Sequence, residues 1–198
     1  MQGAFDGKQS VSNFSNHCVK KSCYILVLYK NSRKEMNDDK LELSYSDFLR
    51  EVYSGRINLI REFERRFGKE KVHAILREYY GSQSIVSCRS MVENLEEPIS
   101  SIEDFRRVIK DLDSRPFSQK TMINEHPDSP DDQAIRTTRH CLWADIFNEF
   151  GAADIGKIML CDTDHLTAEV FHPKIRLERT KTIMEGDDCC DFVYHWKE

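Results

Sequence analysis

The feature that most constrains the fold of this chain is a change in its apolar pattern at Arg115-Pro116. Before that point, apolar residues recur every three or four positions, which is typical of amphipathic helices. After it come short runs separated by turn signals, which is typical of strands and short helices. Because helices and strand pairs are segregated along the chain, the sequence predicts an α+β fold with an antiparallel sheet.

The N-terminal half predicts three helices. Ser46 is a plausible N-cap for the first helix, and Gly68 ends it. A second helix follows Gly68, and a third runs from Ile102 to Leu112 behind Ser101. The apolar stripes of the first two helices contain Ile57, Ile60, Phe63 and Phe67, then Val72, Ile75, Leu76 and Tyr79. His73 is expected at the surface or core edge, and Cys88 is expected to be structural.

The C-terminal half predicts strand, strand, helix, helix, strand, strand. The predicted ranges are 117–125, 133–141, 143–150, 154–171, 174–184 and 189–196. Glu185-Gly186-Asp187-Asp188 is a turn signal between the last two strands. A hairpin there would bring residues 179–182 close to Cys190 and Asp191.

Composition narrows the function classes. The 198 residues carry a net charge of −5 with both signs mixed, and no basic stripe indicates nucleic acid. The longest apolar run, Tyr24–Tyr29, is too short to span a bilayer, and no signal peptide is visible. We therefore expect a cytoplasmic protein without membrane or nucleic-acid partners, with homo-oligomerisation left open. Residues 1–40 predict a variable, disordered segment, and 41–198 a single domain with parts 41–115 and 116–198.

The stretch from Leu160 to Phe192 gathers chemistry-bearing residues. Cys161, Asp164 and His165 stand at i, i+3 and i+4, so one helix face would present all three. The chain has seven cysteines, an odd count in a domain too large to need a disulfide framework. They are therefore interpreted as thiols.

Several blocks of this region resemble one enzyme family. They are Thr138-Arg139-His140-Cys141, Glu149-Phe150-Gly151, Leu160-Cys161-Asp162-Thr163-Asp164, Phe171-His172-Pro173, Leu177 to Gly186, and Cys190-Asp191-Phe192. Together they resemble the L-2-amino-thiazoline-4-carboxylic acid hydrolase family over Thr138–Tyr194. His140, Leu142 and His165 depart from the pattern usual in that family. The resemblance implies a hydrolase with a small-molecule substrate and without a cofactor. The enzyme would open a cyclic amidine ring at a C–N or C–S bond and yield a carbamoyl-cysteine.

The resemblance also implies site residues. A thiolate or an activated water would attack the ring carbon, and Cys161 is the first choice of nucleophile, ahead of Cys141 and Cys190. His165 could lower the pKa of the Cys161 thiol. Asp164 and Asp191 are candidates for acid or base, and Arg179 could clamp the substrate carboxylate. Thr180 and Thr182 are further binding candidates, although strand alternation would turn both away from Arg179.

Three alternatives stay open. Each cysteine could instead be a buried structural thiol. A mixed zinc site could draw on Cys141, Cys161, Asp164, His165, Cys189 and Cys190, although the chain has no CxxC pair. The protein could also be a non-catalytic small-molecule or metal-binding module, because Gly186 to Cys190 weakly resembles the close of a 4-vinyl-reductase-type domain. A family member recruited to a biosynthetic pathway is a further possibility.

Overall fold

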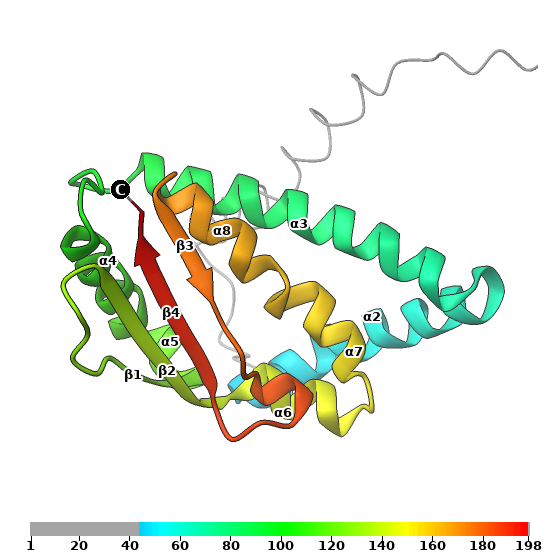
Figure 1. Ribbon diagram of the computed structural model, residues 1–198. Coiled ribbons are helices and arrows are strands. Elements are labelled where there is room, and N and C mark those ends of the chain that lie inside the picture. The colour runs from blue at the N-terminus through cyan, green and yellow to red at the C-terminus, as the bar shows by residue number, and fades with distance from the viewer. Residues whose placement is uncertain (1–43, 198) are drawn as a thin grey trace, which may run out of the picture. The chain divides into compact units, whose positions relative to one another are not determined.

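The computed structural model describes residues 44–197 (Figure 1). The predicted disorder of residues 1–40, and the strand or helix predicted at Cys23–Tyr29, lie outside the described residues. Within the described range, no helix is long and apolar enough to cross a membrane.

Two long helices come first. α2 (Tyr45–Phe67) begins at Ser44, whose hydroxyl accepts a hydrogen bond from the Asp47 amide, so the predicted cap at Ser46 is wrong by two residues. α2 ends at Gly68, as predicted, because φ of +87° there suits glycine. α3 (Lys69–Glu93) is the predicted second helix and includes Cys88. Phe63, Phe67, Ile75 and Tyr79 of the predicted stripes are exposed.

α4 (Ile102–Ser114) begins at Ser101, whose hydroxyl accepts from the Asp104 amide, as the sequence predicted. A short helix, α5 (Pro116–Thr121), then replaces the first half of the strand predicted at 117–125. Proline at the first helical position favours this start, because its missing N–H has no partner there anyway. Only Met122–Glu125 remains as strand β1.

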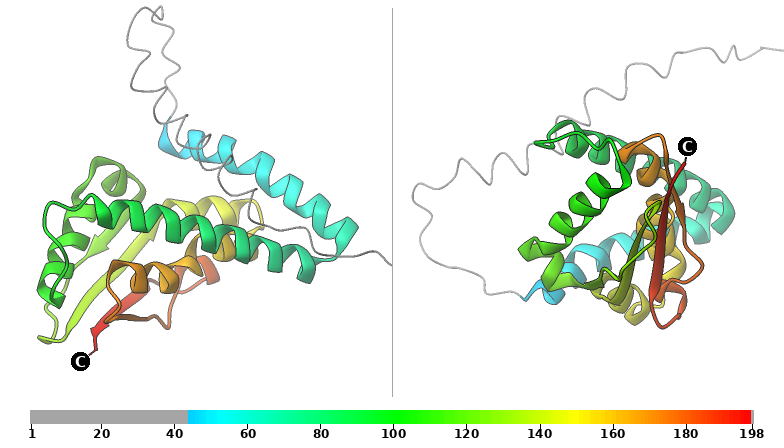
Figure 2. Two further views of the ribbon diagram at one scale, coloured as in Figure 1. Left: turned by 90° about the horizontal axis from the view of Figure 1, so that it is seen from above. Right: turned by 60° about the vertical axis from the view of Figure 1, so that its left-hand side comes forward.

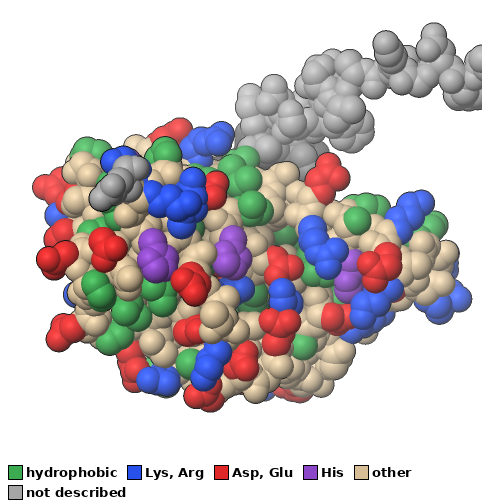
Figure 3. All heavy atoms as spheres, viewed as in Figure 1, with side chains coloured by type: hydrophobic (Ala, Val, Ile, Leu, Met, Phe, Trp, Pro, Cys, Tyr) green, Lys and Arg blue, Asp and Glu red, His purple; other side chains and the backbone are tan. Residues whose placement is uncertain are grey.

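The sheet has the order β1-β2-β4-β3, and every neighbouring pair is antiparallel. Its other strands are β2 (Gln133–Cys141), β3 (Ile175–Glu178) and β4 (Cys190–Trp196). Burial alternates along β4, so one sheet face is covered and the other faces solvent (Figures 1 and 2). The predicted α+β class is therefore confirmed. In the view of Figure 3, acidic and basic side chains are interspersed.

Two apolar clusters hold the helices in place. One packs α4 and α8 (Thr163–Phe171) on the covered sheet face around Phe105 and Tyr194. The other packs α2 and α3 around α6 (Leu142–Glu149) and α7 (Ala153–Gly156), with Phe147 fully buried. The candidate site described below draws residues from the elements of both clusters.

The helix predicted over 154–171 is interrupted. Between α7 and α8 lies a π-helical turn, η2 (Lys157–Cys161), in which the Asp162 amide donates to the Lys157 carbonyl at 2.8 Å. Such turns insert one extra residue into a helix and are frequent at functional sites. The turn ends at Cys161, so the simple i, i+3, i+4 geometry assumed from the sequence does not hold there.

The strand predicted over 174–184 is also too long. β3 ends at Glu178, and residues 179–182 leave the sheet before a 3-10 turn, η3 (Ile183–Glu185). Carboxylates replace the missing ladder partners: Asp191 accepts from the amides of Thr180 and Lys181, and Asp187 from that of Thr182. Gly186, at φ of +100°, then completes the predicted turn into β4.

Gly156 provides a test of this packing. A Cβ there would lie 2.6 Å from the Phe147 ring and 2.7 Å from the Met184 sulfur. We expect Gly156→Ala to lower the free energy of unfolding by about 1–3 kcal/mol, because the core must shift to admit the methyl group. Gly55→Ala is the control, since nothing lies within 4 Å of its added Cβ and alanine favours a helix. Chemical denaturation of both variants checks this; equal stabilities would contradict it.

Candidate functional site

A cavity of about 250 Å³ opens where β2 and β4 meet η2, α8 and α3. Its lining is Ser84, Met122, Arg136, Thr138, Cys141, Trp143, Met159, Leu160, Cys161, Thr163, Asp164, Arg179, Met184, Cys190 and Phe192. The sheet register determines which strand residues form the floor of the cavity. Thr138 pairs with Cys190, and Arg136 pairs with Phe192, on the covered face. The cavity is therefore lined by three cysteines, two arginines and one aspartate.

Five sequence-predicted site residues line this cavity together: Cys141, Cys161, Asp164, Arg179 and Cys190. They come from the end of β2, the π-turn, α8, the segment after β3 and the start of β4. Cys161, Asp164, Arg179 and Cys190 thus lie in one cavity lining. Their individual roles stay predictions.

Thr182 connects two of the thiols from beneath the cavity wall. Its hydroxyl donates to Cys161 Sγ at 3.8 Å and accepts from Cys190 Sγ at 3.8 Å and the Met184 amide at 3.3 Å. The Ile183 amide donates to Cys190 Sγ at 3.3 Å. Because the chain leaves the sheet after Glu178, the alternation that would have turned Thr182 away from Arg179 does not apply.

Arg179 and Asp164 form a buried ion pair at the cavity wall. Arg179, with 6% of its side chain exposed, donates from Nη1 to Asp164 Oδ2 and from Nη2 to the Cys161 carbonyl at 3.1 Å. Asp164 Oδ1 accepts no hydrogen bond within residues 44–197, and 32% of this side chain is accessible. Burial raises the pKa of Asp164, while Arg179 and Arg136 oppose that change.

Three predicted binding residues lie elsewhere. His165 is exposed and does not line the cavity. Asp191 accepts hydrogen bonds from the Thr180 hydroxyl and from two loop amides, so both residues shape the segment after β3 rather than contact the cavity. Burial acts to raise the pKa of Asp191, but these hydrogen bonds hold it below its usual value. Thr180, Asp191 and His165 therefore do not line the cavity, and their binding roles stay predictions.

Burial disfavours the thiolate form of two cavity cysteines, Cys161 and Cys141. Burial raises the pKa of Cys161 to about 12, and the charge of Asp164 adds to that rise while Thr182 and Arg179 oppose it. Burial also raises the pKa of Cys141. The expectation that His165 lowers the pKa of Cys161 is wrong, since that imidazole lies at the surface.

Sequence reasoning missed Arg136, Thr138 and Phe192, which line the cavity. Thr138 stands in one of the family-like blocks but was given no site role; its hydroxyl donates to Asn124 Oδ1 at 2.7 Å. The available signal was spacing, because Arg136 and Thr138 stand two apart on β2 and must share a face. The same spacing places Phe192 beside Cys190 on β4.

The residues weighed as zinc ligands do not form a ligand set in the described range. Within residues 44–197, the one group of potential ligand atoms lying within 4.8 Å of one another is Glu64, His73 and Asp154, away from the cavity. Arg61 donates to both carboxylates of that group, and Lys69 Nζ lies 2.6 Å from Asp154. His73 is buried rather than at the surface, and Cys88 is buried with its thiol near the Thr167 carbonyl.

Comparison with models of known protein families identifies the family of this chain. A model described as L-2-amino-thiazoline-4-carboxylic acid hydrolase matches residues 47–194. The chain belongs to this family. The match covers α2 through most of β4 and so includes every residue that lines the cavity. Comparison with curated proteins finds no matching sequence. The name of the amino-thiazoline-carboxylic acid hydrolase family is that of a hydrolase, which fits a small cavity lined with thiols and charged side chains.

The raised pKa of Cys161 can be measured by alkylation. We expect iodoacetamide to modify Cys161 slowly at pH 7, with a rate that rises roughly tenfold per pH unit up to pH 10, because only the thiolate reacts. Peptide mass spectrometry after timed quenching gives the rate. The unfolded chain is the control, since its cysteines should titrate near the ordinary value of about 8.5. A rate that levels off below pH 8 in the folded protein would mean an activated thiol instead.

Proposed function

We propose that this protein hydrolyses a small cyclic amidine of the thiazoline carboxylic acid class by cysteine-dependent attack. The observation that carries the proposal is the convergence of Cys161, Asp164, Arg179 and Cys190 on one cavity. These residues come from separate blocks of the family pattern. The family name supplies the substrate class.

The cavity suits such a ligand in size and polarity. Its volume of about 250 Å³ is smaller than that of pockets for drug-sized molecules. A single five-membered ring with one carboxylate is a ligand of matching size. Asp164 is the one acidic residue in the lining, and its Oδ1 is available as an acceptor. A carboxylate pairs well with the parallel N–H groups of a protonated amidine, by the geometry that joins arginine to carboxylates.

A neutral thiol suits this substrate class. In the proposed first step, Cys161 Sγ bonds to the ring carbon between sulfur and nitrogen, the electron pair of the C=N bond moves to nitrogen, and the thiol proton passes to the Asp164 carboxylate. Protonation of the amidine makes the carbon electrophilic, so no preformed thiolate is needed and the raised pKa of Cys161 is no obstacle. The ring C–S or C–N bond then breaks, and its heteroatom takes a proton.

Water completes the reaction. It attacks the carbon now bound to Cys161, the bond to Sγ breaks, and the cysteine thiol is restored. The net change is addition of one water and opening of one ring bond, which yields a carbamoyl-cysteine. Thr182 is hydrogen-bonded to Cys161 and Cys190 and holds the attacking sulfur in place. Arg179 orients Asp164.

Replacement of Cys161 tests the nucleophile. With L-2-amino-thiazoline-4-carboxylate as substrate, we expect Cys161→Ser to lower kcat by about three orders of magnitude or more with a nearly unchanged Tm. Chromatography follows ring loss, and a thiol reagent reports whether the C–S bond broke. Cys189→Ser is the control, because Cys189 is buried but does not line the cavity.

Other outcomes discriminate the alternatives. Near-normal turnover in Cys161→Ser would exclude that thiol, and Cys141→Ser and Cys190→Ser would then separate a different nucleophile from direct attack by water. Lost activity together with a lost fold would indicate a structural cysteine.

A second candidate function is a non-catalytic binding module. The observation in its favour is that burial keeps the Cys161 thiol protonated, as in structural cysteines. Saturable binding of the amino-thiazoline carboxylate without any turnover at catalytic protein concentrations would favour it over the hydrolase.

A further inference from the structure

Arg136 is a buried cation at the centre of the cavity floor. It lies in the middle of β2, pairs in register with Phe192, and keeps 17% of its side chain exposed. Its guanidinium carbon sits 4.1 Å from the centre of the Phe192 ring, compared with 5.4 Å for that of Arg179. Cation–π contact of this kind partly compensates a buried charge but leaves the N–H donors free.

The hydrogen-bond donors of Arg136 have no acceptor. Within residues 44–197 its guanidinium makes no hydrogen bond, and its Nε is buried without a partner. Its one ion-pair partner in this range is Asp113, with Nη1 and Oδ1 3.7 Å apart. Leaving buried donors unsatisfied costs free energy, so this arrangement favours an added acceptor.

Arg179 differs in this respect. Its two terminal nitrogens already donate to the Asp164 carboxylate and to the Cys161 carbonyl. Binding a substrate carboxylate there would compete with both interactions. Arg136 can bind one without breaking any hydrogen bond.

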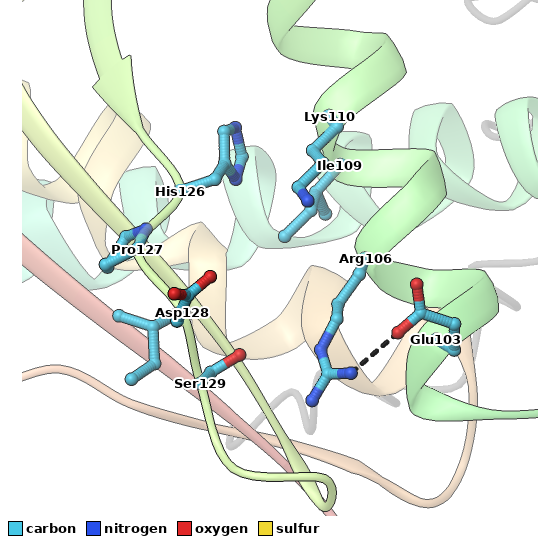
Figure 4. A pocket seen from close by; sticks show the side chains of 9 residues that line it. Glu103, Arg106, Ile109, Lys110, His126, Pro127, Asp128 and Ser129 are labelled. Atoms are coloured by element: carbon cyan, nitrogen blue, oxygen red, sulfur yellow. Dashed lines mark hydrogen bonds and ion pairs between the residues drawn. The ribbon is translucent and has the colours of Figure 1, made fainter.

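Another arginine-containing cavity, formed by α4 and the loop before β2, offers no such donor. It measures about 330 Å³ and contains Arg106, which points toward Glu103 (Figure 4). Arg106 also donates to the carbonyls of Pro130 and Gln133, so its donors are used to hold the loop before β2. His126 of that cavity lies 3.0 Å from Asp113, whose other oxygen faces Arg136, although the histidine contact lacks hydrogen-bond geometry.

We propose that Arg136 binds the carboxylate of the substrate, an inference that rests on the proposed hydrolase function. Arg179 is paired with Asp164, and Asp113, the ion-pair partner of Arg136, lies outside the lining, so Arg136 is the lining cation left for an anionic group. The guanidinium fork meets a carboxylate with two parallel hydrogen bonds. The substrate binds as a zwitterion, with its carboxylate at Arg136 and its protonated amidine at Asp164. Arg179 is then a positioning residue for Asp164.

Two probes isolate this contact: L-2-amino-thiazoline-4-carboxylate, and 2-amino-2-thiazoline, which lacks the carboxylate. In Arg136→Gln we expect KM for the carboxylate to rise about ten- to a hundredfold, the scale of a lost charged hydrogen bond. KM for 2-amino-2-thiazoline, which has no carboxylate contact to lose, should change far less. Arg136→Lys, which keeps the charge but loses the fork, should retain part of the preference.

The matched control is Arg139→Gln, three residues along β2, because Arg139 is exposed and pairs with Glu125. It should leave both probes unaffected. An equal change for both probes in Arg136→Gln, or no change for either, would overturn the proposal. So would loss of the preference in Arg179→Gln but not in Arg136→Gln.

Calorimetry separates failure of this proposal from failure of the proposed function. If the wild-type protein turns over neither probe, the hydrolase assignment fails, but binding of the carboxylate probe can still be compared between the wild type and Arg136→Lys, with Arg139→Gln alongside. Binding that weakens only when Arg136 is changed supports the carboxylate site. No detectable binding by the wild type, or equal binding by all three proteins, overturns it.

Discussion

The ion pair between Arg179 and Asp164 is the interaction on which the candidate site depends. It joins the segment that leaves the sheet after β3 to the first turn of α8, and the second nitrogen of Arg179 holds the carbonyl of Cys161. Removing either partner would leave a buried charge uncompensated, which costs far more than the pair itself contributes. One guanidinium thus sets the relative positions of the π-turn, the helix and the loop.

Local backbone irregularity makes this arrangement possible. The π-turn at Lys157–Cys161 places Cys161 at the junction with α8, and the early end of β3 frees residues 179–182 to fold over the edge of the sheet. Asp191 and Asp187 accept the amide hydrogens that would otherwise have lost their partners. Polar side chains outside the cavity therefore determine how its wall is built.

The charged side chains of the cavity differ in how many of their hydrogen-bonding groups already have partners. Asp164 has one oxygen bound and one available, Arg179 is fully engaged, and Arg136 has donors without acceptors. Burial disfavours the thiolate of Cys161 and of Cys141 and so raises the pKa of both. The proposed substrate is matched to such thiols, because a protonated amidine is electrophilic enough to need no standing thiolate.

The sequence by itself determined the α+β class, the helices before Arg115, strand β2, the caps at Ser101 and Gly68, and the cysteine, aspartate and arginine positions that meet in the cavity. These follow from local periodicity, from capping chemistry and from resemblance in short blocks, all of which are readable along the chain. Only the tertiary structure decided that His165, Thr180 and Asp191 lie outside the cavity and that Arg136 lies within it. The physical reason is that a π-turn and a strand that ends early change which side chains face inward, and the hydrogen bonds that stabilise both come from residues distant in sequence.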